Sequence, residues 1–133
     1  MPARDRYHDN VVHALQKEGW DVTDEQVLLI VGKRYVWTDI QAEKDGQTIY
    51  VEVKGFETRY SIIEYLASTV GQYVMYSASI EYLQLDILLY LAVPNHAFYG
   101  ILSETLGQQV MKKANIRLLV FNPIAEEVTQ WQI

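Results

Sequence analysis

The sequence predicts an α/β (α+β) domain built on a mixed β-sheet that helices flank. Segments with helical spacing of apolar residues alternate with short runs of β-branched and aromatic residues along the chain. The length, 133 residues, is enough for one sizeable hydrophobic core, and no repeat or low-complexity linker divides the chain. We therefore expect residues 1–133 to form a single domain with the element order α-β-β-β-α-β-α-β-β.

The first four elements are a helix and three strands. Apolar residues recur at helical spacing from Asp5 to Glu18, and Gly19 then ends the helix. Asp45-Gly46 is a strong signal for a tight turn between the second and third strands, which therefore form a hairpin. The three predicted strands are Val27–Val31, Tyr35–Gln41 and Thr48–Lys54.

The second half of the chain begins with a long helix and ends with a pair of strands. Ser61 and Glu64 have the spacing of a capping box, at the start of a helix that we expect to reach Ser79. Ile87–Val93 is a continuous apolar run that Pro94 ends, which is typical of a strand buried on both faces. The remaining predicted elements are a helix from His96 to about Lys113, in which Gly100 and Gly107 are unfavourable, and strands Ile116–Phe121 and Val128–Ile133 around an Asn122-Pro123 turn.

Composition excludes several classes of protein. The formal net charge is −6, from 11 basic and 17 acidic residues, which argues against a broad basic face for nucleic acid. The basic residues are scattered, and the doublets among them are Lys33-Arg34 at a turn and Lys112-Lys113 at a helix end. The absence of cysteine excludes disulfides, thiolate zinc sites and thiol catalysis. Neither a signal peptide nor a membrane-spanning apolar run is apparent, so we expect a cytoplasmic protein with no membrane partner.

The hairpin around Asp45-Gly46 brings two carboxylates together. If its turn is a two-residue type I′ turn, Asp39 lies directly opposite Glu52. Trp37 lies opposite Lys54 in the same register. Alternation along the strands places these four side chains on one face and apolar residues on the other. The apolar face, which we expect to pack on the core, comprises Val36, Ile40, Ile49, Val51 and Val53.

Two opposed carboxylates on one face suggest a cation site. Directly opposed Cβ atoms lie about 4.5–5.5 Å apart, where like charges repel unless water or a cation separates them. Oxygen ligands in a chain without cysteine favour Mg²⁺ or Mn²⁺. Lys54 beside such an ion would stabilise the charge that develops during phosphodiester hydrolysis. The alternative is a solvated strand face that carries ordinary surface charges.

The first helix, the hairpin and the long helix together resemble the restriction-endonuclease-like PD-(D/E)XK fold. Asp39 stands at the first acid of that motif and Glu52-Val53-Lys54 at E-x-K, with Thr38 in place of the proline. In the long helix, Gln72 and Tyr76 resemble the Q-x-x-x-Y element of RecB-type nucleases, where they would orient the substrate or the attacking water. Residues four apart share a helical face, so both can point toward the hairpin. The alternative is that Tyr76 is a packing aromatic residue and Gln72 a surface polar one.

The first helix departs from the pattern of related resolvases. Where those proteins carry a glutamate near the metal, this chain has His8, with Asp9 beside it. His8 leads the apolar face of the predicted helix, so it can point inward as a further catalytic residue. The alternative is a helix-end histidine that makes a structural hydrogen bond.

Four segments spread over the chain carry a more specific resemblance. They are PARDRYHDNVVHAL, KRYVWTDIQAEKDGQTIYVEVKGF, GQYVMY and the closing strand. With them the chain resembles the XisH family, the fdxN-element excision controlling factors of cyanobacteria. The resemblance implies a nuclease-like fold and a role in site-specific DNA excision alongside a recombinase. It also implies a companion protein of the XisI type.

The resemblance does not supply a reaction, and two functions stay open. In the first, the protein is a Mg²⁺- or Mn²⁺-dependent endodeoxyribonuclease. Asp39, Glu52 and the Val53 carbonyl then hold the metal, and Lys54 is the electrostatic catalyst. In the second, the protein is a catalytically silent regulatory module that binds a recombinase, an XisI-type partner or DNA.

Half of the ten tyrosines cluster in one segment. They are Tyr60, Tyr65, Tyr73, Tyr76 and Tyr82. They cannot all face one core, so we expect some of them to form an exposed aromatic surface, and tyrosine is favoured at interfaces. A homodimer is a reasonable expectation from such a surface. The alternative is amphipathic packing along one long helix.

Overall fold

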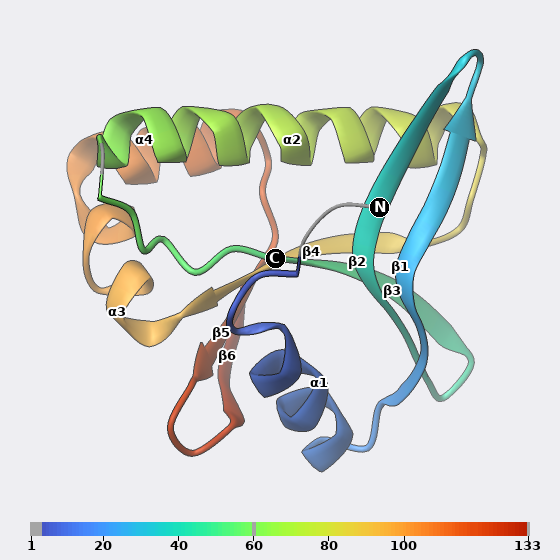
Figure 1. The fold of residues 1–133 in the computed structure, drawn as a ribbon, viewed down its shortest axis with the longest axis horizontal. Coiled ribbons are helices and arrows are strands. Elements are labelled where there is room, and N and C mark those ends of the chain that lie inside the picture. The colour runs from blue at the N-terminus through green and yellow to red at the C-terminus, as the bar shows by residue number, and fades with distance from the viewer. Residues whose placement is uncertain (1–3, 60, 133) are drawn as a thin grey trace.

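A six-stranded mixed sheet, in the order β1-β2-β3-β4-β5-β6, organises the chain. The structure is a computed structural model that describes residues 4–59 and 61–132 (Figure 1). β1 to β3 are antiparallel, β3 to β5 are parallel, and β6 is antiparallel to β5. The elements are α1 (His8–Lys17), β1 (Asp21–Val31), β2 (Arg34–Lys44), β3 (Gln47–Val53), α2 (Ile62–Tyr82), β4 (Leu88–Pro94), α3 (Asn95–Phe98), the 3-10 helix η1 (Ile101–Ser103), α4 (Thr105–Lys113), β5 (Leu118–Asn122) and β6 (Glu127–Gln132).

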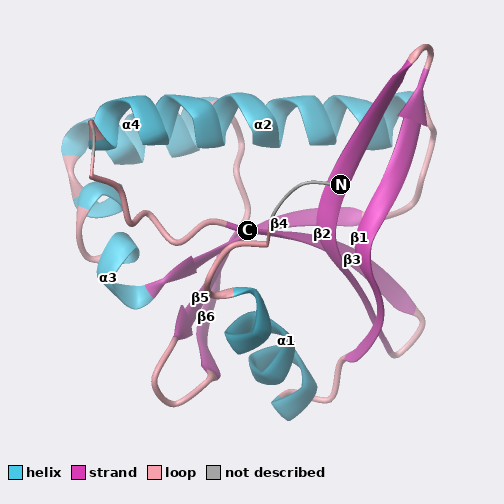
Figure 2. Cartoon of the chain, viewed as in Figure 1, coloured by secondary structure: helices cyan, strands magenta, loops and turns pink. Residues whose placement is uncertain are grey.

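Helices cover both faces of the sheet, as the sequence predicts. α2 and α4 lie along one face and α1 lies against the other (Figure 2). Two clusters of buried side chains result, an α2-side cluster that includes Leu66, Tyr73 and Leu91, and an α1-side cluster that includes Leu15 and Phe121. Successive residues of β4 alternate between the two clusters, so the prediction of a strand buried on both faces is confirmed.

The predicted helix from His96 to Lys113 is wrong, because this stretch forms α3, η1 and α4 instead. The chain leaves the helical conformation at Gly100 and Glu104, and Gly107 inside α4 permits the segments to pack closely. A Cβ atom at this position would lie 2.1 Å from the Ile101 carbonyl oxygen, so α4 packs on η1 more closely than any side chain allows. The residue that appeared to weaken a helix is the one that permits a close contact between two helical segments.

The first strand begins earlier than the sequence predicts. β1 starts at Asp21 rather than Val27, and its first residues are mostly polar and exposed. β1 is an edge strand, and an edge strand pairs on one side only and needs no apolar run to do so. The early residues of β1 therefore carry no apolar signal, although they pair with β2 as far as Asp21 and Glu43.

The hairpin between β2 and β3 has the predicted register. Asp45 and Gly46 both adopt positive φ angles, of 50° and 79°, as a type I′ turn requires. The strands pair from Lys44 with Gln47 up to Ile40 with Val51. The site residues lie just beyond this last pair, where the ladder ends.

The apolar face of the hairpin is divided between the two clusters. The four residues from Ile40 onward pack in the α1-side cluster as predicted; they are Ile40, Ile49, Val51 and Val53. Val36 does not join them and packs against the α2-side cluster. Figure 1 shows the reason, since the β1–β2 hairpin bends away from the rest of the sheet and rises past the end of α2. Because β2 bends, Val36 and Ile40 pack in different clusters although both stand at alternate positions of the same strand.

α2 carries most of the predicted tyrosine cluster. Ser61 caps it by accepting a hydrogen bond from the Glu64 backbone N–H at 3.3 Å, as the capping box predicts. Tyr73 is buried, whereas Tyr65 and Tyr76 are half-buried and Tyr82 is exposed; Tyr60 lies outside the described residues. Amphipathic packing therefore accounts for most of the described tyrosines.

No helix within residues 4–59 and 61–132 has both the length and the apolar character that crossing a bilayer requires.

Candidate functional site

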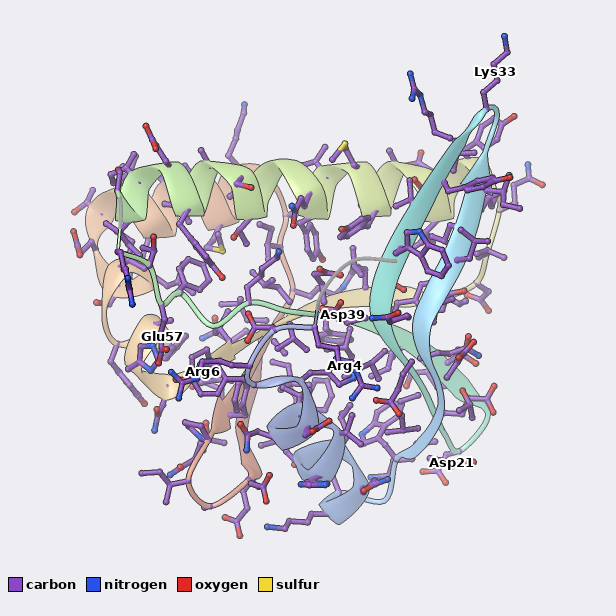
Figure 3. The ribbon with its side chains drawn as sticks, in the orientation of Figure 1. Arg4, Arg6, Asp21, Lys33, Asp39 and Glu57 are labelled. Atoms are coloured by element: carbon purple, nitrogen blue, oxygen red, sulfur yellow. The ribbon has the colours of Figure 1, made fainter. Side chains whose placement is uncertain are left out.

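A cavity of about 190 Å³ opens where β2, β3 and α2 meet the segment before α1. Six of the predicted site residues line it, three from the end of β3 and its continuation, one from β2 and two from α2. Asp39 and Arg4, which both line it, lie near each other in Figure 3. The lining residues are Arg4, Asp5, Trp37, Asp39, Glu52, Val53, Lys54, Gln72 and Tyr76.

Asp39 occupies the place where the β2–β3 ladder ends. Its Oδ2 accepts a hydrogen bond of 2.7 Å from the Val53 backbone N–H, in place of a backbone carbonyl. Burial raises the pKa of Asp39, and the Val53 hydrogen bond and the charges of His8 and Lys54 oppose that rise. The hydrogen bond from Val53 thereby holds the Asp39 side chain at the edge of the cavity.

Glu52 is the most deeply buried charged group of the cavity, with 5% of the residue exposed. Its Oε1 lies 3.9 Å from Lys54 Nζ, and its Oε2 has no hydrogen-bond partner among the described residues. Burial and the neighbouring Asp39 carboxylate raise the pKa of Glu52 to about 9, while Lys54 opposes the rise. The solvated-face alternative is therefore wrong, because α2 covers this face of the sheet. The carboxylate pair needs a proton or an added cation to be stable at neutral pH.

Gln72 and Tyr76 lie one turn apart on α2 and both line the cavity. Gln72 is half-buried rather than a surface residue, and its Oε1 lacks a hydrogen-bond partner in the described part of the chain. Burial, followed by the charges of Glu52 and Asp39, raises the pKa of the Tyr76 phenol. Tyr76 is therefore a protonated hydrogen-bond donor beside the two carboxylates.

His8 opens α1 and is turned inward, with 1% of the residue exposed. Its Nε2 lies 2.7 Å from Glu25 Oε1, and its buried Nδ1 has no partner among residues 4–59 and 61–132. His8 does not line the cavity, although its charge acts on the carboxylate of Asp39. The structural hydrogen bond that the alternative interpretation expects is present, and the catalytic role of His8 stays a prediction.

Four residues around the site were not predicted: Arg4, Asp5, Glu25 and Trp37. Arg4 contacts Asp9 Oδ1 at 3.2 Å and Glu25 Oε1 at 3.1 Å, and Asp5 Oδ2 accepts a hydrogen bond of 3.1 Å from the Gly55 N–H. Only Trp37 had a usable signal, because alternation places it on the face of Asp39. Arg4 precedes the first periodic segment, Asp5 stands at its first position, and Glu25 lies in the polar part of β1.

His8, Asp9 and Glu25 form a second group of potential ligands, whose atoms all lie within 4.8 Å of one another. The guanidinium of Arg4 already contacts both carboxylates. Arg4 thus contacts both carboxylates of this group at hydrogen-bond distance, whereas in the cavity Lys54 lies 3.9 Å from Glu52 and leaves the other oxygen of Glu52 without a partner among the described residues.

Comparison with known proteins identifies the family. The family model described as "XisH protein" matches residues 1–129. The chain belongs to the XisH family. The crystal structure of a fdxN element excision controlling factor protein from Anabaena variabilis has 32% sequence identity and a TM-score of 0.92, covering 98% of this chain and 100% of that one. That of an XisH family protein from Nostoc punctiforme PCC 73102 has 29% identity and a TM-score of 0.92, covering 97% and 100%.

No curated protein matches the chain. The resemblance to the XisH family that the four sequence segments carry is confirmed, and the shared fold extends over nearly the whole length of both relatives. The mixed sheet and its flanking helices are compatible with the restriction-endonuclease-like core.

The donor atoms of this XisH-family site fit a hard divalent cation. Asp39, Glu52 and Val53 all line the cavity and carry carboxylate or carbonyl oxygens, the kind of ligand atom that Mg²⁺ and Mn²⁺ prefer. The strongest observation is the buried, unpartnered Oε2 of Glu52, because a carboxylate oxygen without a donor or a cation is costly to bury. These three residues could hold the ion, and Lys54 would lie beside it.

Proposed function

We propose that this XisH-family protein is a controlling factor for site-specific excision of a DNA element, and that its cavity hydrolyses phosphodiester bonds with Mg²⁺ or Mn²⁺. The observation that carries the hydrolytic proposal is the buried Glu52 carboxylate, with one oxygen unpartnered, beside Asp39 and Lys54. The excision role follows from the Anabaena variabilis relative, whose description names excision of the fdxN element.

The residues of the cavity divide the chemistry between them. Asp39, Glu52 and the Val53 carbonyl would hold the cation, which lowers the pKa of a bound water and neutralises the phosphate. The ammonium of Lys54 stabilises the negative charge that develops on the phosphoryl oxygens. A cationic side chain 3.9 Å from a ligand carboxylate oxygen is near enough to reach a phosphate bound at the same ion.

Three further side chains complete the proposed site. Gln72 presents a buried amide oxygen that orients the attacking water, and the protonated Tyr76 donates a hydrogen bond to the substrate. His8 does not line the cavity, and its role is positioning: its Nε2 hydrogen-bonds Glu25, and its imidazole lies near enough to Asp39 to act on that carboxylate. Glu25 thus acts as a positioning residue for the imidazole.

A nicking assay tests the hydrolytic proposal. Purified protein incubated with supercoiled or branched DNA and Mn²⁺ should cut it, and Lys54→Ala should lower the rate by about 10²–10³-fold, as for loss of one transition-state donor. Lys112→Ala, an exposed lysine outside the cavity, is the control and should cut at the wild-type rate. Absence of cleavage with every DNA form, with and without an XisI-type companion, would refute the claim.

The second candidate is a catalytically silent regulatory module. The net charge of −6 favours it, because such a chain attracts DNA weakly at long range and suits protein partners. In this case the protein acts by binding another protein. The partner is the site-specific recombinase, an XisI-type protein or a second copy of the chain. A pull-down with the recombinase tests this function. Binding by the wild type that Asp39→Asn and Lys54→Ala both retain, together with the absence of nicking activity, would favour it.

A further inference from the structure

The β1–β2 hairpin projects from the body of the molecule toward the region beyond α2 (Figure 1). Its strands remain paired up to Val31 with Arg34, so the tip is a tight turn on a regular two-stranded ribbon. Lys33 stands at the tip and points away from the protein (Figure 3). The ribbon is thus an arm whose base packs in the α2-side cluster and whose tip extends away from the sheet (Figure 1).

One face of this arm is apolar, with three exposed side chains and the half-buried Trp37. Leu28 pairs with Trp37, and Ile30 pairs with Tyr35, so the four side chains share a face. The exposed fractions of Leu28, Ile30 and Tyr35 are 39%, 53% and 68%. We call these four residues the arm face. Apolar side chains gathered on an exposed ribbon mark an interaction surface.

The arm face is continuous with the carboxylate cavity. Trp37 belongs to both, because it also lines the cavity with Asp39. Tyr35, Trp37 and Asp39 follow one another at alternate positions of β2, so they lie in a row of roughly 13 Å at the rise of a strand. An occupant of the arm face therefore leads directly to the two acids.

The charge of the arm differs from that of the rest of the chain. Residues 27–38 contain Lys33 and Arg34 and no acid, although the whole sequence has 17 acids. Neither residue makes an ion pair within the described part of the molecule. The arm thus offers two uncompensated cations next to exposed rings, which complements a polyanion with aromatic groups.

We propose that the arm binds an unpaired DNA strand and leads it into the cavity. Bases stack on Tyr35 and Trp37, and the phosphates contact Lys33 and Arg34. A duplex fits less well, because its bases are already stacked and offer no free ring face. A protein seated on the arm face would cover Trp37 and with it the cavity, whereas a substrate strand uses both. The inference rests on the proposed function and specifies the form of DNA that the site takes.

The stacking contact is tested by fluorescence anisotropy with a short fluorescein-labelled oligothymidylate. The titration uses the Asp39→Asn protein in EDTA, so that neither cleavage nor a bound metal contributes. The strand should bind more tightly than a duplex of the same length, and Tyr35→Ala should weaken binding about tenfold. The control is Tyr99→Ala, which removes a tyrosine that is 74% exposed and lies outside the arm, and it should leave affinity unchanged.

The phosphate contacts are tested by the salt dependence of the same binding. Two neutralised phosphates contribute about −1.4 to the slope of log K against log salt on a single strand. The double variant Lys33→Ala, Arg34→Ala should lose this contribution. Lys112→Ala, Lys113→Ala removes the other basic doublet of the chain and should keep the wild-type slope.

Three results would overturn the inference: no binding of the strand, tighter binding of the duplex, or equal loss in the arm and control variants. Light scattering provides a fourth, because a doubled mass that Tyr35→Ala abolishes would assign the arm face to a second copy of the chain. Circular dichroism checks that each variant is folded. If the strand binds through the arm but wild-type protein with Mn²⁺ does not cut it, the proposed function fails while the arm contact stands.

Discussion

Two glutamates of this protein occupy opposite electrostatic environments. Glu126, at the turn between β5 and β6, accepts a hydrogen bond of 2.9 Å from Asn10 and lies 2.7 Å from His13 Nδ1. These contacts lower its pKa. Glu52, in the cavity, is buried with one oxygen unpartnered, and burial together with Asp39 raises its pKa.

This difference distinguishes a carboxylate that binds other parts of the protein from one that is suited to bind a cation. The chain supplies the partners of Glu126 itself, both from α1, so that contact fastens α1 to the β5–β6 turn. For Glu52 the chain supplies Lys54, at 3.9 Å, and a backbone hydrogen bond from Asp39, but it also places the acid of Asp39 beside it and leaves one oxygen of Glu52 unpartnered among the described residues. A fold that places a buried acid beside a half-buried one and compensates them only in part is typical of a cation site rather than a structural ion pair.

The largest expected effect is stabilisation of the wild type by Mn²⁺. A ligand that binds only the folded state at a hundred times its Kd stabilises it by about 2.7 kcal/mol. Glu52→Gln should lose this gain, whereas Glu126→Gln should retain it. Thermal unfolding with and without Mn²⁺ measures all three proteins. Equal stabilisation of the two variants would remove the distinction between the glutamates.

A smaller effect is expected from pH in the absence of metal. The pKa of Glu52 is about 9 in the folded protein, against an ordinary value of 4.5, so the folded state binds the proton more tightly. This contribution to stability is complete below about pH 4.5 and is lost as the pH rises toward 9. Glu52→Gln cannot ionise, so at pH 8 we expect it to be about 1–2 kcal/mol more stable than the wild type. Urea unfolding at several pH values in EDTA provides the measurement.

That pH comparison has a definite contrary outcome. If the wild type and Glu52→Gln keep the same difference in unfolding free energy from pH 4.5 to 9, the carboxyl group of Glu52 is not protonated by its surroundings. The two carboxylates would then need neither a proton nor a cation to be stable in the folded protein.

The smallest effect, of opposite sign, is expected at Glu126. Its pKa is lowered by its contacts with His13 and Asn10, so its contribution is present above the ordinary value of 4.5 and is lost as the pH falls through the lower, folded value. Glu126→Gln should therefore be less stable than the wild type at neutral pH, and the difference should vanish in acid. Acid titration followed by circular dichroism checks this, and a difference that grew in acid would contradict it.

The carboxylate site could be predicted from the sequence because its signals are local. The Asp45-Gly46 turn and the alternation along β2 and β3 set a register, and that register brings Asp39 and Glu52 to one end of the hairpin. The four-residue spacing of Gln72 and Tyr76 then places both on one side of α2. Each inference needed only a few neighbouring residues.

What the sequence did not show depends on contacts between distant segments. The burial of Glu52 depends on α2 covering the face, which strand alternation cannot reveal. Glu25 and Arg4 meet His8 and Asp9 only because β1 returns beside the start of α1. The close contact at Gly107 likewise requires η1 and α4 to be folded against each other.

The central claim is that the Asp39 and Glu52 pair is a divalent-cation site. Calorimetric titration of Mn²⁺ into the wild type, Asp39→Asn and Glu126→Gln tests it without any assumption about DNA. We expect the wild type and Glu126→Gln to bind one ion with the same affinity, and Asp39→Asn to bind at least about tenfold more weakly, as expected when an oxygen ligand is lost. Equal binding by the wild type and Asp39→Asn would contradict the account.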